Sequence, residues 1–189
     1  KTGTLTKGNF EVTSYTNDYV LQLAASLEKF SLHPIAKAIQ TAYAGEIVGF
    51  ENVEEKPGFG LTATLDNKQI VIGNEKLLNE YNIQVPTTIG TSVHVALGGE
   101  YLGNVIIKDQ LKKSSIDAVK GFQSYGIEVH MLTGDKDDVA KEVATELGIH
   151  YRSGLLPDEK LDYMNSIKGN NMFIGDGIND APSLVNADV

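Results

Sequence analysis

The sequence contains no cysteine, which excludes a disulfide framework and a thiolate metal site. No apolar stretch approaches the ~20 residues that a helix needs to span a bilayer. Positive charge is also scarce, because 16 Lys and Arg residues stand against 25 Asp and Glu residues, giving a net charge of −9. Since nucleic acids and anionic membranes select basic surfaces, we expect no nucleic-acid partner for this chain.

The remaining composition is ordinary for a globular protein. The chain has 189 residues, of which 41% are hydrophobic and 22% charged, and this length allows one large domain or two small ones. Both ends fall inside sequence patterns: Lys1 opens within a Gly/Thr-rich motif, and Val189 closes the chain without a stop signal. We therefore expect the sequence to be an excised piece of a longer protein.

The first half of the chain predicts an antiparallel sheet with helices. Apolar residues at helical spacing indicate helices over residues 17–30 and 34–43. Short alternating runs joined by turn residues are typical of hairpins. These runs cover residues 61–65, 68–72, 92–97 and 101–108. We expect residues 11–106 to fold as a separate antiparallel α+β lobe, hinged at two adjacent strands.

After Asp109 the pattern changes to alternating helices and strands. This alternation predicts a parallel, doubly wound sheet. The predicted helices cover residues 112–125, residues 137–147 and a segment ending near Lys168, and the predicted strands cover residues 127–132, 149–151 and 171–174. The predicted fold class is thus α/β, with a doubly wound parallel-sheet domain and an inserted antiparallel α+β domain.

The eight residues after the last predicted strand carry the most specific signal. Residues 175–182 read Gly-Asp-Gly-Ile-Asn-Asp-Ala-Pro and place Asp176, Asn179 and Asp180 at the carboxyl end of a parallel strand. Ligands bind at that edge of an open α/β sheet, and oxygen ligands on a short turn suit Mg²⁺. The structural alternative is a turn chosen for the backbone angles that Gly, Asn and Asp tolerate.

Two other polar loops point to the same chemistry. Residues 1–4 read Lys-Thr-Gly-Thr, residues 133–135 read Thr-Gly-Asp, and Lys160 lies near the start of a predicted helix. All of them would lie at the carboxyl ends of parallel strands. Together with residues 175–182 they supply a hydroxyl, a cation and Mg²⁺ ligands, which phosphoryl transfer needs in order to hold and neutralise a phosphate.

This combination closely resembles the cytoplasmic catalytic unit of the P-type ATPases, in the haloacid-dehalogenase superfamily. The resemblance covers essentially the whole chain and is most specific at residues 175–182 and at residues 1–6, Lys-Thr-Gly-Thr-Leu-Thr. Residues 31–34, Ser-Leu-His-Pro, resemble the His-Pro motif of the heavy-metal branch.

The resemblance implies a phosphorylation domain made of residues 1–10 and 107–189, and a nucleotide-binding domain made of residues 11–106. The positions it implies for the adenine nucleotide are Glu28, His33, Gly58, Gly60, Gly73 and Asn74. From the residues alone, His33 is more typical of a capping or packing residue, and the Gly-Phe-Gly run at residues 58–60 is more typical of a turn. The resemblance reverses both interpretations.

In the phosphorylation domain the resemblance implies the use of ATP with Mg²⁺. The catalytic positions it implies are Lys1, Thr2, Thr133, Gly134, Lys160, Asn179 and Asp180. Thr2 would give a backbone oxygen to Mg²⁺ and Asp176 a carboxylate. Thr133, Gly134 and Lys160 would bind the phosphoryl group.

The sequence departs from the family pattern at its first residue. The family motif begins with an aspartate, the nucleophile, directly before the position of Lys1. We expect that aspartate, and the apolar strand that carries it, in the full-length protein. The resemblance implies an ATP-driven exporter of heavy-metal cations in the cell membrane, with this region facing the cytoplasm and zinc or cadmium favoured over copper. The implied partners are the transmembrane and actuator domains of the same protein, and we expect the segment itself to be monomeric.

Two other functions compete with a pump. A soluble haloacid-dehalogenase phosphatase with a cap domain needs a second catalytic aspartate two residues after the nucleophile, where this sequence has Thr2. A stand-alone nucleotide-binding regulator would show no turnover. Transmembrane helices in the flanking sequence would decide for the pump.

Overall fold

The computed structural model describes residues 1–167, 169–175, 185 and 187–188. The predicted site residues Asp176, Asn179 and Asp180 lie outside the described residues.

The chain divides into two compact units. Unit 1 comprises Lys1–Gly8 and Gln110–Val189, and unit 2 comprises Asn9–Asp109. Both boundaries fall within strands, the first in β1 (Thr6–Tyr15) and the second in β6 (Glu100–Leu111). The domain boundaries expected from the sequence, after residues 10 and 106, fall in the same two strands.

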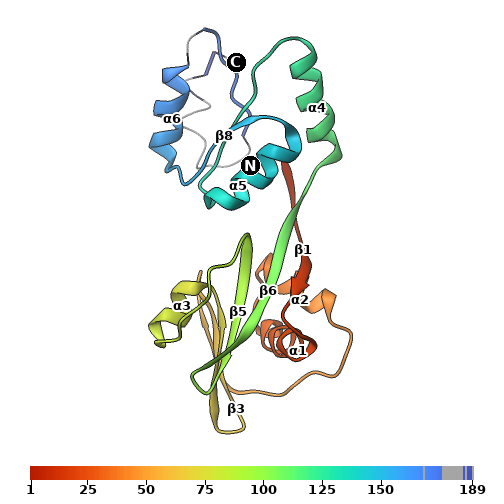
Figure 1. The fold of residues 1–189 in the computed structure, drawn as a ribbon, viewed down its shortest axis with the longest axis vertical. Helices are drawn as coiled ribbons and strands as arrows, with labels where there is room; N and C mark the ends of the chain where they lie inside the picture. The colour runs from red at the N-terminus through yellow and green to blue at the C-terminus, as the bar shows by residue number, and fades with distance from the viewer. Residues whose placement is uncertain (168, 176–184, 186, 189) are drawn as a thin grey trace. The chain divides into compact units, whose positions relative to one another are not determined.

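Unit 2 is organised around a six-stranded sheet in the order β1-β6-β5-β4-β3-β2 (Figure 1). The remaining strands are β2 (Glu51–Lys56), β3 (Gly60–Leu65), β4 (Lys68–Gly73) and β5 (Thr91–Leu97). Every neighbouring pair from β2 to β6 is antiparallel. At the β3–β4 turn Asp66 and Asn67 have φ values of 48° and 61°, as a tight two-residue hairpin requires. The antiparallel class predicted for this half of the chain is confirmed.

Helices cover both faces of this sheet. They are α1 (Asp18–Leu27), the 3₁₀ helix η1 (Glu28–Phe30), α2 (Pro34–Ala42) and α3 (Glu75–Glu80). In β4, Ile70 and Ile72 pack in the larger core with α1 and α2, whereas Val71 packs with Leu77 and Leu78 of α3. Successive side chains of a strand point to opposite faces, so α1 and α2 lie on one face of the sheet and α3 on the other (Figure 1).

Unit 1 is built around a parallel crossover. Strands β7 (His130–Leu132) and β8 (His150–Arg152) pair in parallel, and α5 (Asp137–Leu147) connects them. Gly148 ends α5 in a left-handed conformation with φ of 64°. The buried core of this unit consists of Val119, Met131, Ala140, Val143, Ala144 and Leu147. Unit 1 also contains the helices α4 (Lys113–Ser124) and α6 (Pro157–Ser166).

The strand predicted at residues 171–174 is wrong. These residues have no regular secondary structure, and Met172 and Ile174 are 47% and 58% exposed. Among the described residues of unit 1, strands β7 and β8 pair only with each other, so no strand pairs with the apolar run. The backbone of Asn171 bonds to Asp188 instead: its C=O accepts from the backbone N–H of Asp188 at 3.1 Å, and its N–H donates to Oδ2 of Asp188 at 2.9 Å. Phe173 and Ile174 instead line a cavity of about 510 Å³ together with Met131.

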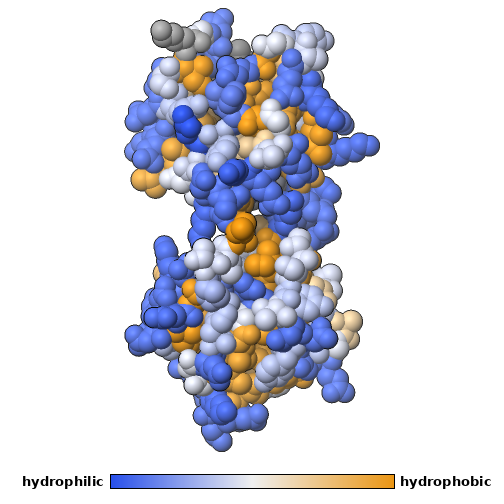
Figure 2. Space-filling model, in the orientation of Figure 1, coloured by the Kyte–Doolittle hydropathy of each residue, from blue (hydrophilic) through white to orange (hydrophobic). Residues whose placement is uncertain are grey.

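The surface is mainly hydrophilic on the face seen in Figure 2, with hydrophobic residues emerging in separate patches. In the described ranges, no helix combines the length and the apolar character that crossing a membrane requires.

One exposed apolar side chain precedes a predicted site residue: Leu32 is fully exposed directly before His33.

The crowding of backbone atoms around Gly60 gives a test of the fold. A Cβ on Gly60 would lie 2.2 Å from the carbonyl oxygen of Ile72, and Gly60 has φ of 144°. We expect Gly60→Ala to lower the free energy of unfolding by roughly 2 kcal/mol or more, because backbone strain and overlap act together. Gly49→Ala is the control, since a Cβ there meets nothing within 4 Å. Urea denaturation of both variants is the measurement, and equal midpoints would contradict the close approach.

Candidate functional site

The first group of candidate residues surrounds the start of α2 in unit 2. His33 is the N-cap of α2, and its Nδ1 accepts a hydrogen bond from the backbone N–H of Ile35 at 3.2 Å. Pro34 at the first helical position has no N–H to satisfy, which favours this helix start. Because Nδ1 is the acceptor, the neutral ring carries its proton on Nε2. His33 is exposed, so this second ring nitrogen remains accessible as a donor.

Ser31 connects the start of α2 to strand β2 of the sheet through hydrogen bonds. Its Oγ donates a hydrogen bond to Oε1 of Glu55 on β2 at 2.8 Å and accepts one from the backbone N–H of His33 at 3.2 Å. Ser31 is buried, with 7% of its surface exposed. The η1–α2 junction is therefore held against β2, close to the turn that carries Gly58 and Gly60.

Glu28 is the buried acid of this group. Its residue surface is 6% exposed, and its backbone carbonyl accepts a hydrogen bond from Nε2 of Gln40 at 2.8 Å. Burial, and secondly the negative charge of Glu55, raise the pKa of Glu28 from 4.5 to about 7. The Glu28 carboxyl is thus divided between its neutral and ionised forms near neutral pH.

The remaining candidates of unit 2 are Gly58, Gly60, Gly73 and Asn74, which lie around the backbone carbonyl of Phe59. Gly60 pairs with Gly73 across β3 and β4, and a Cβ on Gly73 would lie 2.3 Å from the Phe59 carbonyl oxygen. That oxygen accepts a hydrogen bond from the backbone N–H of Asn74 at 2.9 Å. The side chain of Asn74 donates to the Gly58 carbonyl at 3.0 Å and accepts from Leu77 N–H at 3.0 Å as the N-cap of α3. Two segments far apart in sequence are thereby fixed side by side.

Gly58 differs from the other two glycines. Its φ is 78°, a conformation that favours glycine, yet an added Cβ would meet nothing within 4 Å. The backbone at Gly58 therefore stays open to an approaching group, whereas Gly60 and Gly73 are required by the packing of the protein itself.

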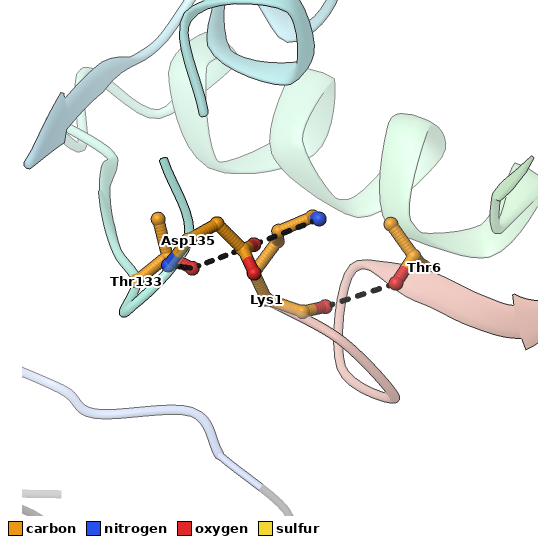
Figure 3. A network of polar contacts seen from close by, with 4 residues as sticks. All are labelled: Lys1, Thr6, Thr133 and Asp135. Carbon is orange, nitrogen blue, oxygen red and sulfur yellow. Dashed lines mark hydrogen bonds and ion pairs between the residues drawn. The ribbon is translucent and has the colours of Figure 1, made fainter. Parts of the chain in front are cut away.

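A second group lies in unit 1, where Lys1 meets the loop after β7 (Figure 3). Lys1 Nζ forms an ion pair with Oδ2 of Asp135 at 2.8 Å, and its side chain is only 6% exposed. Thr133 Oγ1 donates to the same oxygen at 2.8 Å and accepts from the backbone N–H of Asp135 at 3.1 Å. The Lys1 carbonyl accepts from the side chain of Thr6 at 3.3 Å. Lys1 and Thr133, both predicted site residues, are thus brought together by Asp135.

Asp135 is ionised at neutral pH. Burial alone would raise its pKa, but hydrogen bonding to Lys1, the charge of Lys1 and the hydrogen bond from Thr133 together hold the pKa below its usual value. Sequence reasoning did not place Asp135 among the candidate residues. The available signal was its position two residues after Thr133, where an Asp commonly bonds to its own loop.

Thr2, Gly134 and Lys160 are the other predicted residues of unit 1 that the structure describes. Thr2 is exposed in the turn after Lys1, and a Cβ on Gly134 would lie 3.3 Å from the carbonyl oxygen of Leu155. Lys160 is half-buried in the first turns of α6. No group of three His, Cys, Asp or Glu side chains that could hold a metal ion occurs among the described residues.

Comparison with known proteins identifies the family. Residues 1–188 match the model of the haloacid dehalogenase-like hydrolases. The solved catalytic domain of the CPx-ATPase CopB-B is 32% identical with a TM-score of 0.83, and the match covers 100% of this chain and 75% of that one. The chain belongs to the haloacid dehalogenase-like hydrolases, as a P-type ATPase catalytic domain.

Longer P-type ATPases match along the entire chain. A zinc-transporting ATPase of Synechocystis and a cadmium, zinc and cobalt-transporting ATPase of Helicobacter felis are each 40% identical, and a copper-exporting P-type ATPase of Staphylococcus epidermidis is 37% identical. The chain spans 29%, 30% and 26% of these relatives. The solved structure of a zinc-transporting PIB-type ATPase in the E2.Pi state is 29% identical with a TM-score of 0.76, over 99% of this chain and 34% of that one.

The buried Glu28 makes the stability of this catalytic domain depend on pH. Between pH 4.5 and about 7 the folded state binds more protons than the unfolded state, so the free energy of unfolding falls as pH rises through this window. The loss by pH 8 is on the order of 3 kcal/mol. We expect Glu28→Gln, which cannot ionise, to be more stable than the wild type at pH 8 and to lack this pH dependence.

Urea midpoints at pH 5 and pH 8 measure this effect. Glu54→Gln is the control, because Glu54 is exposed on the neighbouring β2. Stability curves of wild type and Glu28→Gln that run parallel across pH would contradict a buried, proton-binding Glu28.

Proposed function

We propose that this chain is the cytoplasmic catalytic segment of an ATP-driven heavy-metal cation pump in the cell membrane. The observation that carries the proposal is the match along the whole chain to the catalytic domain of a CPx-ATPase, at 32% identity and a TM-score of 0.83. Transport, substrates and partners belong to the longer protein, whose transmembrane and actuator domains would act on this segment.

In this proposal unit 2 binds ATP through Glu28, His33, Gly58, Gly60, Gly73 and Asn74. The exposed His33 ring supports it with an Nε2 donor, and Gly58 supports it with open space where a side chain would otherwise stand. Buried Glu28 adds a carboxyl that can bond to a polar edge of the base. The donors and acceptors present therefore fit an adenine nucleotide.

Unit 1 would hold the transferred phosphoryl group. Thr133, Gly134 and Lys160 are the described residues proposed for this role, and Lys1 is a further catalytic residue beside them. Asn179 and Asp180, which lie outside the described residues, would complete the network of the loop. The ion pair between Lys1 and Asp135 supports a role for Lys1. The Lys1 side chain is only 6% exposed, and a buried cation needs a fixed carboxylate to keep its charge and position. Asp135 thus acts as a positioning residue for Lys1.

Magnesium is proposed only from the family resemblance. Thr2 would supply a carbonyl oxygen and Asp176 a carboxylate, and a bound Mg²⁺ would neutralise phosphate charge. The described residues do not complete such a site, since Thr2 contributes no charge and Asp176 lies outside them.

The acceptor of the phosphoryl group would be the aspartate directly upstream of Lys1. Its carboxylate oxygen would attack the γ-phosphorus of ATP, the bond to the β-phosphate oxygen would break, and ADP would leave. A soluble phosphatase is less consistent with the chain, because its second catalytic aspartate would have to stand where Thr2 does.

The transported ion is proposed to be zinc or cadmium rather than copper. The two relatives at 40% identity are named for zinc and for cadmium, zinc and cobalt, whereas the copper exporter is 37% identical. We propose that the segment faces the cytoplasm, is monomeric and has no nucleic-acid partner, in keeping with its net charge of −9.

ATP binding by unit 2 is tested with His33→Gln. We expect affinity to fall by roughly 1–2 kcal/mol, because one or two hydrogen bonds from the ring are lost. His150→Gln in unit 1 is a matched control for the same substitution at an exposed histidine. Isothermal titration calorimetry is the measurement. If His33→Gln binds ATP as tightly as the control does, His33 is not part of the site.

The nucleophile is tested by labelling with γ-labelled ATP. We expect no covalent label on the 189-residue chain. The natural chain extended through the upstream aspartate should form a hydroxylamine-sensitive acyl phosphate, which Asp176→Ala should abolish, since loss of a metal carboxylate weakens Mg²⁺ binding. A label on any residue of the shorter chain would show that the nucleophile has been misplaced.

A further inference from the structure

Glu28 combines three properties that the binding of a nucleotide in general does not require. It is 6% exposed, it lies beside a second carboxylate on β2, and no side chain in the described part of the molecule contributes a hydrogen bond to its carboxyl group. Its backbone carbonyl, in contrast, accepts from both Ser31 N–H at 3.1 Å and Gln40 Nε2 at 2.8 Å. The carboxyl therefore has no hydrogen-bond partner among the described residues, and it is available to a ligand that can bond to it.

Glu55 is fixed close to Glu28. Ser31 lies three residues after Glu28 and donates its hydroxyl to Glu55 at 2.8 Å, so the second carboxylate cannot swing freely into solvent. The other titratable side chains on α1, η1, the start of α2 and β2 are Asp18, Tyr19, Lys29, His33, Lys37, Glu51, Glu54 and Lys56. The pKa of Glu28 is raised first by burial and second by the negative charge of Glu55.

A protonated and an ionised carboxyl recognise different bases. The neutral acid offers one O–H donor and one carbonyl acceptor, whereas the carboxylate offers acceptors only. Along its Watson–Crick edge adenine presents an acceptor at N1 beside the amine donor at N6. Guanine presents two adjacent donors there, at N1 and N2. The neutral acid is thus complementary to adenine and the carboxylate to guanine.

We propose that Glu28, held next to Glu55, reads the base as a neutral carboxylic acid, so that the site selects adenine over guanine at low and neutral pH and loses this selectivity as pH rises. The inference rests on the proposed nucleotide site. It adds that the protonation state of Glu28 distinguishes adenine from guanine. Glu55 acts as a positioning residue, since its charge keeps the proton on Glu28.

The size of the effect follows from the proton equilibrium. If adenine binds only the neutral form of an acid that titrates near pH 7, ADP affinity falls roughly 30-fold between pH 6 and pH 8.5. GDP affinity moves in the opposite direction. The ratio of the two affinities is the proper readout, because the phosphates of ADP and GDP titrate alike and cancel.

The test is calorimetric titration of the 189-residue chain with ADP and with GDP at pH 6 and at pH 8.5. We expect the ADP preference to fall at least 10-fold across this range. Glu28→Gln presents an amide donor and a carbonyl acceptor at every pH, so it should keep the preference for ADP and lose its pH dependence.

A second variant covers the case in which Glu28→Gln does not fold. Glu55→Gln removes the neighbouring charge and should move the midpoint of the change to lower pH, whereas the exposed Glu54→Gln should leave it in place. If neither nucleotide binds at any pH, the proposed function fails and the inference fails with it. If nucleotides bind but the ratio of affinities does not change with pH, the nucleotide site stands and the inference is overturned.

Discussion

The close approach of two backbones in unit 2 is the constraint on which its candidate site depends. Gly60 and Gly73 face each other so closely that a Cβ on either would overlap main-chain atoms. This contact places the Phe59 carbonyl against the start of α3, where Asn74 bonds to it and also caps the helix. The turn is thereby locked while Gly58 remains open. Ser31 and Glu55 then connect the same end of β2 to the junction that carries Glu28 and His33.

Local signals in the sequence predicted unit 2 well because its elements are joined by short turns. Asp66-Asn67 in a tight hairpin and the N-cap residues Asn17 and Asn74 act within a few residues of their own position. Unit 1 was predicted less well. The apolar run at residues 171–174 has the composition of a buried strand, but a strand needs a neighbour, and none pairs with it among the described residues. Strand β1 has few apolar residues and owes its extended form to pairing with β6.

The same difference between local and long-range information applies to the candidate site. The glycines, His33 and Lys1 were proposed from short motifs, and the structure gives each of them a defined local environment. Asp135 and Glu55 were not proposed, because what distinguishes each is a partner distant in sequence: Lys1 for the former and Ser31 for the latter. No periodicity or spacing reveals such a pair. The two groups of residues are consistent with a division of labour in which unit 2 holds the nucleotide and unit 1 holds the phosphoryl group.

The central claim, that unit 2 carries the nucleotide site, is tested most directly by backbone amide NMR during a titration with ADP. The account predicts that the largest chemical-shift changes occur at Glu28, His33, Gly58, Gly60, Gly73 and Asn74, with the far ends of β3 and β4 near Asp66 unaffected. Shift changes centred instead on the Asp66–Asn67 turn, or confined to unit 1, would contradict it.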